Sequence, residues 1–160
     1  MKPILLLDVD GVLNVPRPRR TLRPICLKSD GDYKPQFFPN RRTSRFMRMA
    51  WDLFDVRWLT AWGSGANLIA RHYGLAERPA IRDLGGESWK AMGAASALLD
   101  YRGRVAWIED GIDDVAMALV ERCGWTYLHC EPYVGVTGEH MKRLREFAMS
   151  SRIATDREGR

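Results

Sequence analysis

The chain has 160 residues, 46% of them hydrophobic, which is enough for one domain with a substantial core. Its apolar runs are too short to span a membrane, and only four apolar residues follow Met1-Lys2-Pro3, so we expect neither a transmembrane helix nor a signal peptide. The three cysteines (Cys26, Cys123 and Cys130) lack the paired spacing of a zinc site, which indicates reduced thiols and a cytoplasmic protein.

The formal net charge of +5 is distributed unevenly. The segment from Val15 to Arg48 holds ten basic and two acidic residues, a net charge of +8, so the rest of the chain carries −3. A strongly basic segment favours a polyanionic ligand such as nucleic acid. A solvated insert whose charge serves solubility is the alternative, and the composition leaves both open.

Four apolar residues, Ile4 to Leu7, lead directly into Asp8, Asp10 and Gly11. A run of this length predicts a buried parallel strand, and ligands of open α/β sheets bind at the carboxyl ends of such strands. Two neighbouring carboxylates repel each other unless a cation lies between them, and Mg²⁺ prefers oxygen ligands. The alternative is an ordinary acidic turn.

After Asn14, five prolines between residues 15 and 40 argue against a long helix. Two short extended pieces, at 24–28 and 33–38, flank the Ser29-Asp30-Gly31-Asp32 turn and predict a hairpin above the end of the first strand. Apolar residues then recur at helical spacing, which predicts a helix over 40–54.

The rest of the chain is predicted to alternate between strands and helices. Further strands are expected at 56–60, 79–81, 105–108 and 125–128, and helices at 64–73, 88–101, 113–123 and from Thr137 onward. This alternation predicts an α/β fold with a five-stranded parallel sheet and helices on both faces. We expect a single domain over 1–149, with a basic insert at 15–40 and a polar tail at 150–160.

Three later features place chemistry at the same edge of the sheet. Thr60 ends a hydrophobic strand, where its hydroxyl can donate to a phosphate oxygen. Lys90 lies in the first turn of a helix, against the helix dipole, which suits an ammonium that reaches an anion. Glu109 and Asp110 follow a second apolar strand and could share a cation with the first acid pair.

Taken in order, the Asp8-Val9-Asp10-Gly11 stretch, Thr60, Lys90 and the Glu109-Asp110 pair resemble the four motifs of the haloacid dehalogenase (HAD) superfamily, in its phosphatase branch. The resemblance implies a HAD-like Rossmannoid fold and Mg²⁺. It assigns the nucleophile to Asp8 and general acid–base catalysis to Asp10. Phosphoryl binding falls to Thr60 and Lys90, and Asp8, Asp10 and Asp110 are implied as metal ligands. Glu109 replaces a commoner Asp, which leaves open which member of this pair meets the metal.

The short insert leaves no room for a large cap domain, and an open site suits a large substrate. Several short stretches also look similar to capless HAD domains predicted in RNA-repair systems. We therefore expect a polynucleotide phosphatase acting on DNA or RNA ends, with substrate-binding residues Thr60, Ala61, Trp62, Lys90, Arg17, Arg19 and Arg20. A nucleotide phosphatase and a non-catalytic HAD-fold binding module are the alternatives.

Overall fold

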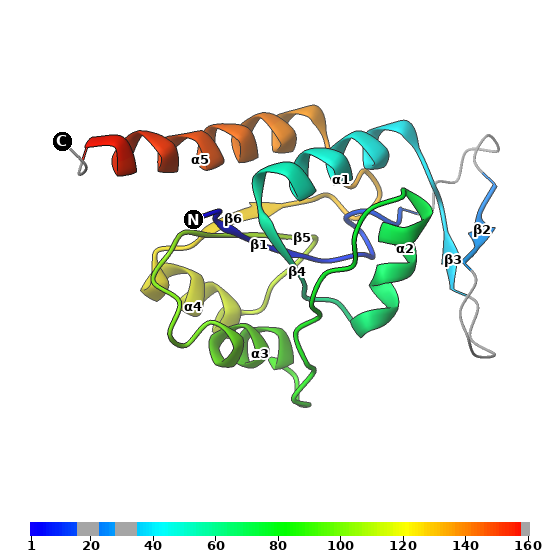
Figure 1. Ribbon diagram of the computed structural model, residues 1–160. Helices are drawn as coiled ribbons and strands as arrows, with labels where there is room; N and C mark the ends of the chain where they lie inside the picture. Colours follow the sequence, from blue (N-terminus) through cyan, green and yellow to red (C-terminus); the bar gives the residue numbers. More distant parts are fainter. Residues whose placement is uncertain (16–22, 28–34, 158–160) are drawn as a thin grey trace.

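A parallel sheet lies at the centre of the protein (Figure 1). The computed structural model describes residues 1–15, 23–27 and 35–157. Four strands, β1 (Ile4–Leu7), β4 (Asp55–Trp58), β5 (Val105–Glu109) and β6 (Thr126–His129), pair in the order β4-β1-β5-β6. All pairs are parallel, so the carboxyl ends of the strands meet at one edge. This confirms the predicted α/β class with a parallel sheet.

The prediction of a fifth strand at 79–81 was wrong. Only Ala80 forms a bridge to the sheet, opposite Trp58. Asn67 explains the difference, because its side chain takes both backbone groups of Arg78, accepting from the N–H at 2.9 Å and donating to the carbonyl at 3.0 Å. Pro79 has no N–H to donate. The segment therefore lies beside β4 without continuing the sheet.

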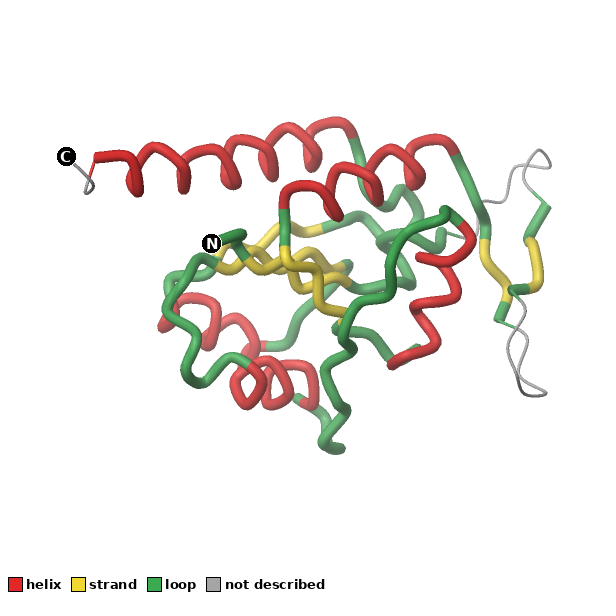
Figure 2. The backbone as a smooth tube through the Cα atoms, in the orientation of Figure 1, coloured by secondary structure: helices red, strands yellow, loops and turns green. Residues whose placement is uncertain are grey.

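Both faces of the sheet are covered by helices (Figure 2). Side chains alternate along a strand, so Leu5 and Leu7 of β1 enter one core while Ile4 and Leu6 enter the other. The first core is closed by α1 (Arg41–Leu53), α2 (Asn67–His72) and α5 (Gly138–Arg157), and the second by α3 (Trp89–Ala97) and α4 (Asp114–Cys123). Burial on both faces explains the uninterrupted apolar run of β1.

Two helices begin at a side-chain cap, whereas the predicted start at Ser64 does not. The Asn40 side chain accepts from the Thr43 N–H at the start of α1, and the Asp113 side chain accepts from the Ala116 N–H at the start of α4. Ser64 caps nothing, because Gly63–Ala66 form a 3₁₀ turn, η1, before α2. The last helix, α5, continues to Arg157 through the expected polar tail. No helix in the described ranges is long and apolar enough to cross a bilayer.

The ends of the predicted hairpin are present as β2 (Ile25–Cys26) and β3 (Gln36–Phe37), which pair antiparallel. Fully buried Phe37 anchors this pair through an edge contact with Tyr73, with the ring centroids 6.0 Å apart. The turn between them and the predicted substrate-binding residues Arg17, Arg19 and Arg20 lie outside the described residues.

The three cysteines differ in a way that tests this fold. Cys130 is fully buried, and burial followed by the neighbouring charge of Asp110 raises its pKa to about 12, whereas Cys26 and Cys123 are exposed. Because the thiolate is the reactive form, iodoacetamide at neutral pH should modify two thiols per native chain and all three after denaturation. Mass spectrometry would locate the sites. Rapid modification of Cys130 in the native protein would contradict the packing of β6.

Candidate active site

Asp8 lies between two neighbouring chain segments at the carboxyl edge of the sheet. Its backbone N–H donates to the Ile108 carbonyl at 3.3 Å, immediately before Glu109. On the other side, the Leu59 N–H donates to the Leu7 carbonyl at 3.0 Å, immediately before Thr60. The register of the parallel strands therefore brings residues from three segments, separated by about 50 positions each, to one point.

Lys90 joins this group from the first turn of α3. Its Nζ lies 3.1 Å from Oδ2 of Asp8 and 2.6 Å from Oε2 of Glu109. The two carboxylates are almost wholly buried, and the lysine side chain is 24% exposed. These two acids at the sheet edge stabilise an ammonium that the dipole of α3 alone would disfavour.

A third carboxylate completes the cluster. Asp8, Glu109 and Asp110 each offer an oxygen, and these three oxygens lie within 4.8 Å of one another. Asp110 can approach because residue 11 is glycine: a Cβ there would lie 2.0 Å from Oδ2 of Asp110, and the φ of Gly11 is +70°. Both members of the Glu109-Asp110 pair therefore take part, and together with Asp8 they could hold a divalent cation.

The charges of this cluster do not balance. Three carboxylates face the single ammonium of Lys90, so the ionised group would carry two excess negative charges. Burial and then the neighbouring Asp8 raise the pKa of Glu109, even though Lys90 opposes this shift. The pKa of Lys90 is also raised, because the attraction of Asp8 and Glu109 outweighs the lowering caused by burial.

Two residues on β6 and just after it experience the same excess charge. Burial, and then the charge of Glu109, raises the pKa of Tyr127 to about 12. Burial, and then the charges of Asp110, Glu109 and Asp8, raises the pKa of Cys130 to about 12. A cation bound among the carboxylates would reduce this negative potential, although the potential does not by itself select Mg²⁺.

Asp10 is held apart from the cluster. Its Oδ2 accepts from the Trp62 indole N–H at 2.7 Å, and its Oδ1 accepts from the Asn14 amide at 2.9 Å. The chain turns immediately after Asp8, as the Asn14 N–H donates back to the Val9 carbonyl at 2.8 Å, and Asp10 is exposed. Two side-chain contacts thus orient this carboxylate at the mouth of the site.

Asn14 also connects the site to the insert. Its amide donates to the Gln36 carbonyl at 3.2 Å, and its side-chain oxygen accepts from the Phe38 N–H at 3.1 Å. Asn14 is buried, so these contacts replace its bonds to water. The position of Asp10 therefore depends on β3, which lies more than twenty residues away in sequence.

Thr60 begins a tight turn beside the cluster. The Gly63 N–H donates to the Thr60 carbonyl at 2.9 Å, and the buried Thr60 hydroxyl oxygen accepts from the Trp62 N–H at 3.4 Å. Its hydroxyl hydrogen remains able to donate to a ligand. Ala61 is exposed and Trp62 half-buried, so this turn forms one wall of the site.

The structure thus gathers Asp8, Lys90 and Asp110 in one cluster, with Thr60 and Trp62 at its side, and places Asp10 outside the cluster but within the site. The sequence left the role of Glu109 open and did not distinguish Asn14. The apolar run at 105–108, which leads directly into Glu109, was the available signal for that residue. Asn14 offered none, because its contacts are with the insert.

No protein-family model, curated protein or solved structure matches the chain. The function of the protein is therefore inferred from its own residues.

Because acids outnumber bases in this cluster, substitutions within it should have opposite effects on the free energy of unfolding. In chelator at pH 7, Glu109→Gln should raise the free energy of unfolding by about 1 kcal/mol, because glutamine supplies the neutral side chain that burial and Asp8 favour in the folded state. Lys90→Met should lower it by about 2 kcal/mol or more, because it leaves the buried carboxylates without their cation. Urea unfolding would measure both.

The sign of the pH dependence follows from Glu109. Its folded-state pKa lies above its usual value of 4.5, so the folded state holds the proton more tightly than the unfolded state does. The stability contributed by this group is present below about pH 4.5 and is lost as the pH rises towards the folded pKa. Glu109→Gln should flatten this decline, and an unchanged slope would show that the decline has another source.

Stabilisation by added metal should distinguish the roles of Asp10 and Asp110. Mg²⁺ at about 100 times its dissociation constant should stabilise the wild type by about 2.7 kcal/mol. Asp110→Asn should abolish this stabilisation, and Asp10→Asn should retain it, because Asp10 lies outside the carboxylate cluster. Thermal unfolding with Mg²⁺ and with chelator would measure the shifts. An equal loss in both variants would restore Asp10 as a ligand.

Proposed function

We propose that this protein is a Mg²⁺-dependent phosphomonoester hydrolase of the HAD type, acting through an aspartyl-phosphate on nucleic acid end phosphates. One observation carries the proposal: a buried aspartate, Asp8, lies 3.1 Å from the Lys90 ammonium within a cluster of carboxylates, while a second aspartate, Asp10, is oriented separately two residues later. Phosphoryl transfer between a carboxylate and a water molecule requires such a division of tasks.

Asp8 is the nucleophile in this proposal. A carboxylate oxygen of Asp8 attacks phosphorus, and the bond from phosphorus to the leaving oxygen breaks. Lys90, which already offsets the charge of Asp8, also binds the oxygens of the phosphoryl group, and the Thr60 hydroxyl donates to the same group. The product of this step is an acyl phosphate on Asp8.

Asp10 is the general acid and general base in this proposal. In the first step its carboxylic acid protonates the leaving oxygen, and in the second its carboxylate removes a proton from the water that attacks phosphorus. The second step releases inorganic phosphate and regenerates Asp8. The contacts from Trp62 and Asn14 keep the Asp10 carboxylate oriented for both transfers.

The residues present fit a divalent cation. Asp8, Glu109 and Asp110 would hold it, as three oxygen donors with two negative charges in excess of Lys90. When bound, the cation would offset the negative charge of the incoming phosphate against these carboxylates. Mg²⁺ rather than another hard cation follows from the HAD resemblance alone.

A large substrate is favoured by the exposure of Asp10 at the mouth of the site. Within the described ranges, the hairpin of β2 and β3 is the only sheet besides the central one. Four exposed arginines of α1 continue the basic segment beyond the insert, at positions 41, 42, 45 and 48. Such a surface suits the phosphates of a polynucleotide. A nucleotide phosphatase, with the insert as a small lid, would use the same chemistry on a smaller substrate.

Hydrolysis of an aryl phosphate tests the reaction. The wild type should release phosphate with Mg²⁺ and not with chelator, and Asp8→Asn should lower the rate at least about 10⁴-fold because it removes the nucleophile. Asp10→Asn should cost about 10²–10⁴-fold, the usual contribution of a general acid–base group. Wild-type activity in Asp8→Asn would refute the covalent mechanism, and inactivity on every phosphate ester would favour the non-catalytic module.

The substrate class is tested through the insert. Replacing Arg17, Arg19, Arg20 and Arg23 with glutamine should weaken binding of a phosphorylated oligonucleotide and reduce the slope of log affinity against log salt by about 0.7 for each lost phosphate contact. Hydrolysis of an aryl phosphate should not change. Preference for mononucleotides in the wild type, or equal losses on both substrates, would favour the nucleotide phosphatase.

A further inference from the structure

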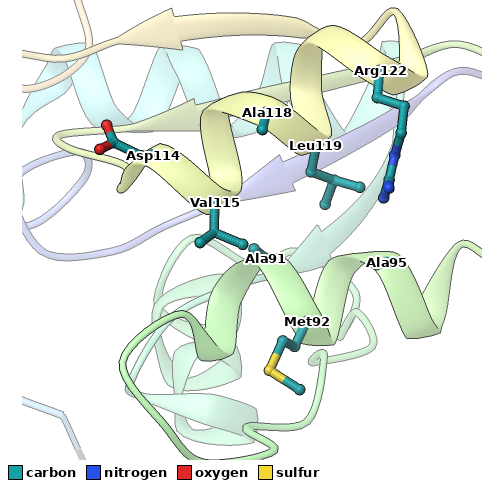
Figure 3. A pocket seen from close by; sticks show the side chains of 8 residues that line it. All are labelled: Ala91, Met92, Ala95, Asp114, Val115, Ala118, Leu119 and Arg122. Atoms are coloured by element: carbon teal, nitrogen blue, oxygen red, sulfur yellow. The ribbon is translucent and has the colours of Figure 1, made fainter.

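An apolar groove lies between α3 and α4, on the opposite side of the sheet from α1 and α5 (Figure 3). It has a volume of about 530 Å³. Its walls are formed by Ala91, Met92 and Ala95 of α3 and by Val115, Ala118 and Leu119 of α4. Met92 and Val115 are 53% and 55% exposed, which is high for apolar side chains that flank the same groove.

The two ends of the groove carry opposite charges. Asp114 lies at the amino end of α4 and Arg122 at its carboxyl end, and Figure 3 shows them on either side of the apolar floor. Neither residue forms an ion pair within the part of the chain that the structure describes. Eight residues of helix separate them by roughly 12 Å along the axis.

This arrangement is complementary to itself. If a second α4 lies antiparallel across the first, with a twofold axis at residue 118, Asp114 of each copy meets Arg122 of the other. Residue 118 is halfway between these two positions and is an exposed alanine, which lets two helices approach closely. A twofold interface requires this reciprocity, in which residue i meets residue j and residue j meets residue i.

We propose that the α3–α4 face is the interface of a homodimer, formed by antiparallel packing of the two α4 helices about Ala118. The apolar walls supply the buried area, and the two Asp114–Arg122 pairs set the direction of packing. The helix α3, which lines the groove, also carries Lys90 of the candidate site. The inference does not depend on the proposed phosphatase activity.

Sedimentation velocity over a concentration series tests the oligomeric state. The wild type should be a dimer. Asp114→Arg opposes two arginines at each contact and Arg122→Glu opposes two acids, so each variant should raise the dissociation constant of the dimer at least about tenfold. Lys142→Glu, a matched reversal at an exposed position of α5, should leave it unchanged. Circular dichroism would verify that each variant is folded.

Mixing the two variants tests the antiparallel geometry. A heterodimer of Asp114→Arg with Arg122→Glu has an attractive pair at both contacts, so the mixture should form dimers more tightly than either variant does alone. Labelling one variant would identify the mixed species.

Three results would each overturn the proposal. They are a wild type that stays monomeric at its highest soluble concentration, a dimer that both charge reversals leave intact, and a failure of the mixture to associate. A monomeric wild type would indicate that the groove binds a different partner.

Discussion

The excess of negative charge at the carboxyl edge of the sheet is the constraint on which the rest of this site depends. Oxygens of Asp8, Glu109 and Asp110 are brought within 4.8 Å of one another, and among the described residues Lys90 is the cation paired with this group. Burial makes this arrangement costly, since charges removed from water need compensation from partners or a cation. A folded chain that maintains such a cluster holds a site ready for positive charge, and the pKa shifts of Tyr127 and Cys130 record the same field.

The backbone that follows β1 fixes the positions of the carboxylates in the site. Because Gly11 has no Cβ, the Asp110 side chain can occupy the space beside it. The turn after Asp8 places Asp10 against different partners, including the Asn14 amide. Asn14 then connects Asp10 to β3. Two carboxylates that lie two residues apart in sequence, Asp8 and Asp10, thereby acquire different surroundings, which is the physical basis for giving them different tasks.

The two faces of the sheet have different exposed surfaces. The helices α1 and α5 present arginines and a basic outer surface, whereas α3 and α4 leave an apolar groove with one charge at each end. These surfaces suit different ligands: phosphates are bound by charge, and a second copy of the chain by apolar area with charges that set its direction. The helix α3 contributes to both, because it lines the groove and carries Lys90, which pairs with Asp8.

The sequence by itself determined the α/β class, most element positions, the strand-end location of Asp8, Thr60 and Asp110, and the helix-start location of Lys90, because periodicity and capping are local properties. It could not determine the number of strands: Asn67 takes the backbone groups of Arg78, and that contact exists only after folding. The full membership of the carboxylate cluster, the separation of Asp10 from it, and the apolar groove between α3 and α4 were likewise decided by tertiary structure. Each depends on distances between segments far apart in the chain, which spacing along the sequence does not encode.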